Sequence, residues 1–156
     1  MANDWPQLNL STISPDVKTT ILARTIGQVV PGTMTFFKYK PETKSKNMWF
    51  DLNPLSLIYK SAKEGFIGYN IHFLNGRIKY EFLMKFKRML ESVDTPVERI
   101  MMASRVLPLI EGKSPWKDTV RHYKYKNLRS RIVMVHPEYW ETAINLPLDK
   151  IVKGNA

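Results

Sequence analysis

The spacing of apolar residues changes in the middle of the chain, from alternation to a helical period. Between Pro31 and Leu74, apolar and polar positions alternate over three short runs, PGTMTFFKYKP, PLSLIYK and GFIGYNIHFL, with turn residues between them. From Gly76 to Val106, apolar residues recur every three or four positions instead. Alternation is typical of half-buried strands, and the longer spacing is typical of amphipathic helices. The pattern predicts a small antiparallel sheet followed by helices.

The run GFIGYNIHFL is predicted to be the second arm of a hairpin that SAKEG closes. Gly65 is expected to take the left-handed conformation in the turn, and Gly68 is expected to admit a close neighbour. A phosphate loop is disfavoured, because such loops stand before a helix and these glycines lead into a strand. Alternation places Asn70 and His72 on the face opposite the core. The predicted core face consists of Ile67, Tyr69, Ile71 and Phe73.

Three hydroxyl-proline pairs predict helix starts, because the hydroxyl caps a free backbone N–H and proline loses nothing in the first turn. These pairs are Ser14-Pro15, Thr95-Pro96 and Ser114-Pro115. At the second pair, Glu98 completes a capping box. The predicted helices span residues 14–27, 77–91, 95–106 and 114–126. A strand near 129–135 and a short helix from Pro137 are expected after them.

These elements predict an α+β fold, in which helices pack on a small, bent antiparallel sheet or on a Src-homology-3-like barrel closed by residues 129–135. A chain of 156 residues has the size of one domain. Residues 1–30 are expected to form an N-terminal arm and helix, and residues 31–156 a single α+β domain. The arm is expected to bind a partner through Trp5, Leu8 and Leu10, and to order fully only when a neighbour binds it.

Composition narrows the class of protein. The chain has 24 Lys and Arg against 14 Asp and Glu, a net charge of +10, and no cysteine, which excludes a disulfide scaffold and a thiolate metal site. It has no signal-like N-terminus and no run of ~20 apolar residues, so we expect an unprocessed, soluble protein without a membrane partner. Residues 113–156 hold nine basic and four acidic residues. This surplus favours a polyanionic neighbour.

The basic residues between positions 113 and 131 are the main functional candidate. On the predicted helix, Lys117, Arg121 and Lys124 share a face, and Tyr123 and Tyr125 are interleaved, an arrangement that suits phosphate contact and base stacking. A solvated basic face whose tyrosines pack inward is the alternative, and the pattern leaves both open. The candidate polyanion-binding residues are Lys117, Arg121, Lys124, Lys126, Arg129 and Arg131.

No catalytic residue, metal ligand or cofactor is predicted. His72 has no acid or hydroxyl beside it in the strand pattern, and the three histidines share no spacing typical of metal ligands. Asp51 is expected at the surface or as a turn cap. The residues predicted to be structural are Gly65, Gly68, Asn70, His72 and Trp140. We therefore expect a protein that is not an enzyme and has no small-molecule substrate.

The succession PGTMTFFKYKP, PLSLIYK, GFIGYNIHFL and YKYKNLRSRIVMVHPEYWETAINLP resembles an uncharacterised family of small basic proteins of large tailed (contractile-tail) phages. The resemblance covers about residues 31–150. Its most specific parts are the Gly-Phe-x-Gly-x-Asn-x-His segment and the ending from Trp140 to Leu146-Pro147. The chain departs from the family where Met48-Trp49-Phe50 replaces an expected proline-tyrosine pair. The resemblance implies a phage context, either in virion assembly or in DNA handling.

Taken together, these features favour a non-catalytic structural or assembly protein of a tailed phage particle, in the tail, baseplate or neck. We expect it in the virion or the host cytoplasm, with other virion proteins as partners. The alternative is a nucleic-acid-binding protein for DNA handling or end protection, which would use the basic run 113–131 to contact DNA.

Overall fold

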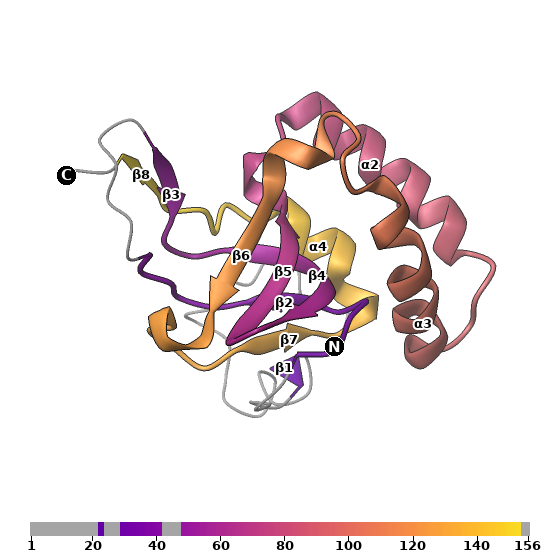
Figure 1. Ribbon diagram of the computed structural model, residues 1–156. Coiled ribbons are helices and arrows are strands. Elements are labelled where there is room, and N and C mark those ends of the chain that lie inside the picture. Colours follow the sequence, from indigo (N-terminus) through magenta and orange to yellow (C-terminus); the bar gives the residue numbers. More distant parts are fainter. Residues whose placement is uncertain (1–21, 24–28, 42–47, 154–156) are drawn as a thin grey trace.

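The protein has an α+β fold, as the sequence predicts, with an open antiparallel sheet and helices packed against it (Figure 1). The computed structural model describes residues 22–23, 29–41 and 48–153. The expected partner-binding residues Trp5, Leu8 and Leu10 lie outside the described residues.

In the described part of the chain, the main sheet has six strands in the order β1-β7-β2-β4-β5-β6, and neighbouring strands are antiparallel. Their bounds are Leu22–Ala23 (β1), Met34–Phe36 (β2), Leu55–Ala62 (β4), Gly65–Asn70 (β5), Val120–Lys124 (β6) and Val133–Val135 (β7). Strands β3 (Trp49–Asp51) and β8 (Ile151–Lys153) pair separately, as a two-stranded ribbon at the upper left of Figure 1.

The sheet does not close, so the alternative of a Src-homology-3-like barrel is wrong. The expected closing strand forms as β7, but β7 pairs with β1 and β2 at one end of the sheet. Strand β6 is the opposite edge of the described sheet. A single isolated bridge joins Tyr39, after β2, to Leu128, after β6 and η5, but no continuous ladder of hydrogen bonds between described residues closes the sheet.

The two long helices match the prediction from apolar spacing. Helix α2 runs from Gly76 to Leu90 and α3 from Pro96 to Val106. Thr95 accepts a hydrogen bond from the Glu98 N–H at 3.2 Å, which is the expected cap. The short helix after Pro137 forms as α4 (Trp140–Asn145). The 3-10 turns are η2 (Ile71–Phe73), η3 (Leu107–Ile110), η4 (Trp116–Thr119), η5 (Tyr125–Asn127) and η6 (Pro137–Tyr139).

Two predicted helices are corrected by the structure. Residues 114–126 form η4, strand β6 and η5, because β6 completes the backbone pairing of β5 from Gly65 to Tyr69. The helix expected over residues 14–27 is wrong at Leu22–Ala23, which pair with β7 as strand β1. The remainder of that prediction falls outside the described residues.

Apolar residues cover both faces of the sheet. One cluster lies between the sheet and the helices, where the Phe86 ring stacks on Phe82 and on Trp140 with centroids 5.0 and 5.4 Å apart. Trp140 also donates to the Val135 carbonyl at 3.0 Å, which fits its predicted structural role. The second cluster consists of Val29, Phe37, Tyr39, Ile58, Phe66, Tyr123 and Ile132.

The hairpin between β4 and β5 forms as predicted, but its glycine acts differently. Glu64, with φ 63°, takes the left-handed conformation that was expected of Gly65. A Cβ on Gly65 would lie 1.9 Å from the Tyr123 carbonyl oxygen, so glycine lets β6 pack against the start of β5. At Gly68, a Cβ would lie 2.3 Å from the Ser56 Oγ, as the expected close approach requires.

Candidate nucleic-acid interface

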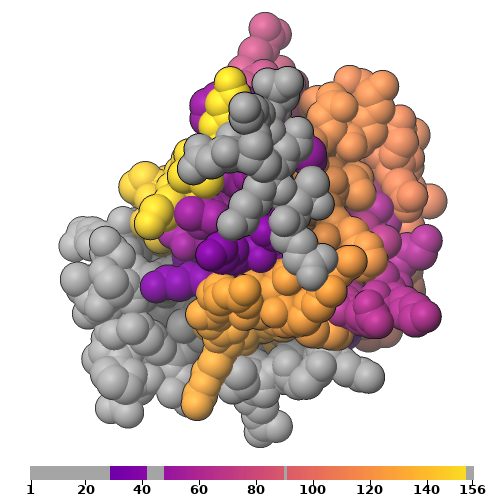
Figure 2. Space-filling view, turned by 60° about the vertical axis from the view of Figure 1, so that its left-hand side comes forward, coloured from indigo at the N-terminus to yellow at the C-terminus, as the bar shows by residue number. Residues whose placement is uncertain are grey.

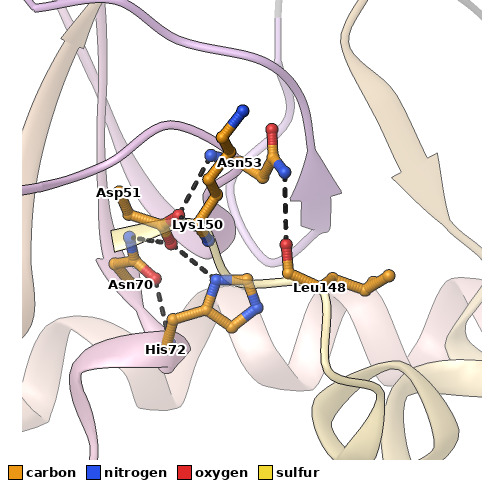
Figure 3. A network of polar contacts seen from close by, with 6 residues as sticks. All are labelled: Asp51, Asn53, Asn70, His72, Leu148 and Lys150. Atoms are coloured by element: carbon orange, nitrogen blue, oxygen red, sulfur yellow. Dashed lines mark hydrogen bonds and ion pairs between the residues drawn. The ribbon is translucent and has the colours of Figure 1, made fainter. Parts of the chain in front are cut away.

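A buried carboxylate connects the β3–β8 ribbon to the sheet. Asp51 Oδ2 lies 2.5 Å from His72 Nδ1 and accepts a hydrogen bond from Asn70 Nδ2 at 3.1 Å (Figure 3). Its Oδ1 accepts the backbone N–H groups of Asn53 at 3.0 Å and Lys150 at 3.1 Å. One side chain thus joins the end of β3, the turn after β5 and the segment that enters β8.

The network keeps Asp51 ionised. Burial by itself raises the pKa of its carboxyl, but the hydrogen bond and charge of His72, with the Asn70 and Asn53 donors, outweigh burial and lower the pKa below 3.8. A buried carboxylate with this many donors is a stable arrangement only while the donors stay in place. The expectation of a surface acid is therefore wrong, because the Asp51 side chain is nearly fully buried. The alternative of a turn cap is confirmed, since Asp51 accepts the backbone N–H of Asn53 two residues further on.

His72 leaves the predicted strand at the point where it meets Asp51. Asn70 Oδ1 accepts the His72 N–H at 2.9 Å and caps η2, so Ile71 and Phe73 do not continue the strand alternation. The Asn-x-His spacing that caps this turn is visible in the sequence. The acid is not, because Asp51 lies 21 positions away and in another strand. Sequence reasoning missed Asp51 for this reason.

The Asp51–His72 pair has the form of a carboxylate that orients an imidazole, as some enzymes use. Here the Nε2 of His72 is buried and has no hydrogen-bond partner among the described residues. Both side chains are nearly fully buried, and the hydrogen bonds of the pair form a buried tie between segments. Within the described residues there is also no group of three His, Cys, Asp or Glu side chains that could hold a metal ion.

Beside this network, a hollow of about 220 Å³ runs along β6, and we call it the β6 groove. Its aromatic residues are Tyr39, Trp49, Phe50, Phe73 and Tyr123, and its basic residues are Arg121, His122 and Lys124. Pro41, Met48, Asp51, Asn70 and Asn127 complete the lining. The groove thus combines aromatic rings and cations over a buried polar network.

Arg121 is held in one orientation at the β6 groove. Its guanidinium carbon lies 4.4 Å from the centre of the Phe73 ring. One of its terminal nitrogens donates to the carbonyls of Asp118 at 2.9 Å and Val120 at 2.8 Å. A guanidinium stacked on a ring and fixed by two hydrogen bonds loses little further entropy when it binds an anion.

The surface next to the β6 groove is basic and lacks acids in its own segments. Residues 119–137 contain five Lys and Arg and no Asp or Glu. Residues 38–40 add two lysines beside this segment. The backbone N–H of Arg129 donates to the Lys38 carbonyl at 2.8 Å, and the backbone N–H of Lys40 donates to the Asn127 carbonyl at 3.0 Å. Figure 2 shows the orange surface of the segment near residues 115–135 beside the indigo surface of residues 29–41.

The predicted polyanion-binding residues do not share a helical face. Arg121 and Lys124 lie in β6, Lys126 lies in η5, and Lys117 lies in η4 before the strand. Arg129 and Arg131 follow in the connection to β7. The structure brings five of the six around β6 and the turn after it, and leaves Lys117 beyond the start of the strand.

The interleaved tyrosines pack inward, which is the alternative that the sequence left open. Tyr123 is 3% exposed and its ring lies 5.0 Å from that of Phe37. Burial raises the pKa of its phenol well above the ordinary value, so the hydroxyl stays neutral. Tyr125 is half-buried against the same cluster. The aromatic residues that sequence reasoning missed at the groove are Trp49 and Phe73, which come from other elements.

Comparisons of the chain with protein-family models, with curated proteins and with solved structures find no match. Among the described helices, none is both long enough and apolar enough to cross a membrane.

Proposed function

We propose that this protein binds nucleic acid, with the β6 groove and its basic surroundings as the contact surface, in the setting of a tailed phage. The observation that carries the proposal is an acid-free basic segment, residues 119–137, part of which lines a groove together with aromatic residues. Phosphates of a nucleic acid attract such a surface over a long range, and the exposed ring of Trp49 offers a stacking partner for a base.

A basic surface kept for solubility alone would not need this geometry. Exposed lysines scattered among acids serve solubility, whereas Arg121 is fixed by two carbonyls and a ring. Lys38 and Arg129 come from segments 91 positions apart, yet a backbone hydrogen bond between them places both beside the turn that follows β6. The clustering therefore arises from the fold as well as from a local run of basic sequence.

Retention of labelled DNA tests this proposal. The protein should retain a mixed-sequence oligonucleotide at ~50 mM salt and release most of it at ~200 mM, because each phosphate contact releases counterions when it forms. Absence of retention at the lower salt concentration would contradict the proposal.

A second candidate is a structural or assembly role in the particle, and exposed apolar residues on the helical side favour it. Val97 and Met101 lie one turn apart on α3 and are 65% and 48% exposed, and Leu109 after the helix is 68% exposed. Exposed apolar residues that are neighbours on one helix, as Val97 and Met101 are, are typical of protein contacts more than of free surface. Mass spectrometry of purified particles tests this role, because absence of the protein from particles would exclude it.

A further inference from the structure

The wall of the β6 groove formed by the β3–β8 ribbon carries an exposed tryptophan. Trp49 is 55% exposed, and the Lys153 ammonium of the paired strand lies 5.9 Å from its ring centre. Tryptophan offers a large ring that gains much from burial, so an exposed indole beside a groove can serve as a contact for a ligand. An exposed indole ring with a cation over it suits a flat aromatic group that has a negative charge nearby.

The strand on the other side of the groove supplies a fixed anion contact. Arg121 uses two of its five N–H groups for the carbonyls of Asp118 and Val120, and the other three have no acceptor among the described residues. A guanidinium with adjacent free N–H groups binds a phosphate through two parallel hydrogen bonds. The planar group is already oriented by the Phe73 ring.

From this juxtaposition we propose that the β6 groove takes one unpaired nucleotide of a single strand, with the base stacked on Trp49 and a phosphate on Arg121. This inference rests on the proposed function and narrows it. In a duplex, each base is stacked on both faces by its neighbours, so its face is not open to a side chain. A single strand exposes base faces, and the groove should therefore prefer it to a duplex of the same length.

The decisive experiment compares fluorescence anisotropy of a labelled oligo(dT) strand with that of a duplex of equal length, for the wild type and for Trp49→Ala. Loss of one stacked base should weaken single-strand binding roughly 5- to 150-fold and leave duplex binding unchanged. Trp49→Phe should restore most of the affinity, because a smaller ring still stacks. Tyr80→Ala is the matched control, since Tyr80 is 63% exposed on α2, away from the groove, and its loss should change neither affinity.

A charge-preserving variant tests the phosphate contact. Arg121→Lys keeps the charge but loses the planar pair of donors, so it should weaken single-strand binding more than duplex binding. Arg88→Lys on α2 is its control and should have no effect. Circular dichroism of each variant separates loss of binding from loss of folding.

Each outcome decides between the two claims. If the wild type binds neither strand nor duplex, the proposed function and this inference both fail. If it binds both and Trp49→Ala weakens the two affinities equally or not at all, nucleic-acid binding stands and the unpaired-nucleotide site is wrong.

Two competitors complete the test. If thymidine monophosphate displaces the strand at an equal molar concentration, the site serves free nucleotides and the strand proposal is overturned. If polyglutamate displaces the strand, and Trp49→Ala binds the strand as tightly as the wild type does, the groove would instead be assigned to an acidic protein.

Discussion

The helical side of the molecule and the side along β6 are both built over apolar clusters, but they differ in how charge is distributed. Residues 76–112, which form the helical side, hold seven basic and five acidic residues, and Arg77 and Glu81 pair across one turn of α2 at 3.3 Å. Residues 119–137 hold five basic residues and no acid. A mixed surface serves solubility, whereas a one-sided surface attracts a polyanion.

The two sides also differ in what holds them to the sheet. The helices pack through stacked rings, among them Phe82, Phe86 and Trp140. The β3–β8 ribbon, which forms one wall of the β6 groove, is tied to the sheet by the polar partners of Asp51. Apolar packing can lose one contact at moderate cost, but a buried carboxylate cannot lose a donor cheaply. We therefore expect substitution of the buried polar residues under the groove to have the largest effects on stability.

The largest effect is expected for His72→Ala. The substitution leaves Asp51 buried without its imidazole partner, and it should lower the free energy of unfolding by about 3 to 5 kcal/mol in urea titrations. His122→Ala is the control: His122 is exposed in β6, and its loss should change stability by less than about 0.5 kcal/mol. A fully stable His72→Ala protein that has lost function would assign His72 a direct role at the site and contradict the structural one.

A smaller loss is expected for Gly65→Ala, which pushes on β6 from inside the sheet. The new Cβ would lie 1.9 Å from the Tyr123 carbonyl oxygen, so β6 must shift, at a cost of about 1 to 3 kcal/mol. Because β6 carries Arg121, DNA retention should fall with stability. Gly76→Ala is the control: its new Cβ would have no neighbouring atom within 4 Å, so neither stability nor DNA retention should fall. Equal behaviour of the two variants would show that the close approach of β6 is unimportant.

The pH dependence of stability should change in Asp51→Asn. The folded-state pKa of Asp51 is lowered below 3.8, so the carboxylate stabilises the fold above that pH, and the contribution is lost as the pH falls through the lower folded value. As the pH falls below about 4, the free energy of unfolding of the wild type should therefore decrease more steeply than that of Asp51→Asn. Asp149→Asn, at an exposed position, is the control for the loss of one acidic side chain. Parallel curves for wild type and Asp51→Asn would contradict the buried tie.

The elements with a clear period were predictable. The hairpin of β4 and β5 and the helices α2 and α3 follow from local alternation, helical spacing and the Thr95 cap. Strand β6 was misassigned because the Ser114-Pro115 pair indicates a helix start, and the spacing of Lys117, Arg121 and Lys124 is compatible with the helix that this start predicts. Residues 120–124 form a strand because they pair with β5. Such pairing joins segments that are distant in the sequence, so local residue spacing cannot predict it.

The candidate site was predictable only in part. The basic residues of 121–131 are visible as a charge surplus, and the structure gathers them along β6 and the following turn. Trp49 and Phe73 line the groove, but neither was predicted there: Phe73 was expected on the core face of a strand, and Trp49 was assigned no role. Asp51 was expected at the surface or as a turn cap, and the Asn53 N–H two residues further on fits the cap. Its burial was not predicted, because its partners His72 and Lys150 arrive through the fold.

The charge difference between the two sides of the molecule leads to one direct measurement, the salt dependence of DNA affinity for two matched pairs of substitutions. Arg121→Gln with Arg129→Gln removes charge from the β6 groove and from the basic surface beside it, and Arg88→Gln with Arg105→Gln removes the same charge from exposed positions on α2 and α3. If the groove contacts phosphates, the first pair should flatten the slope of log affinity against log salt by about 2, and the second should leave it unchanged. Equal slopes for both pairs would contradict binding at the groove.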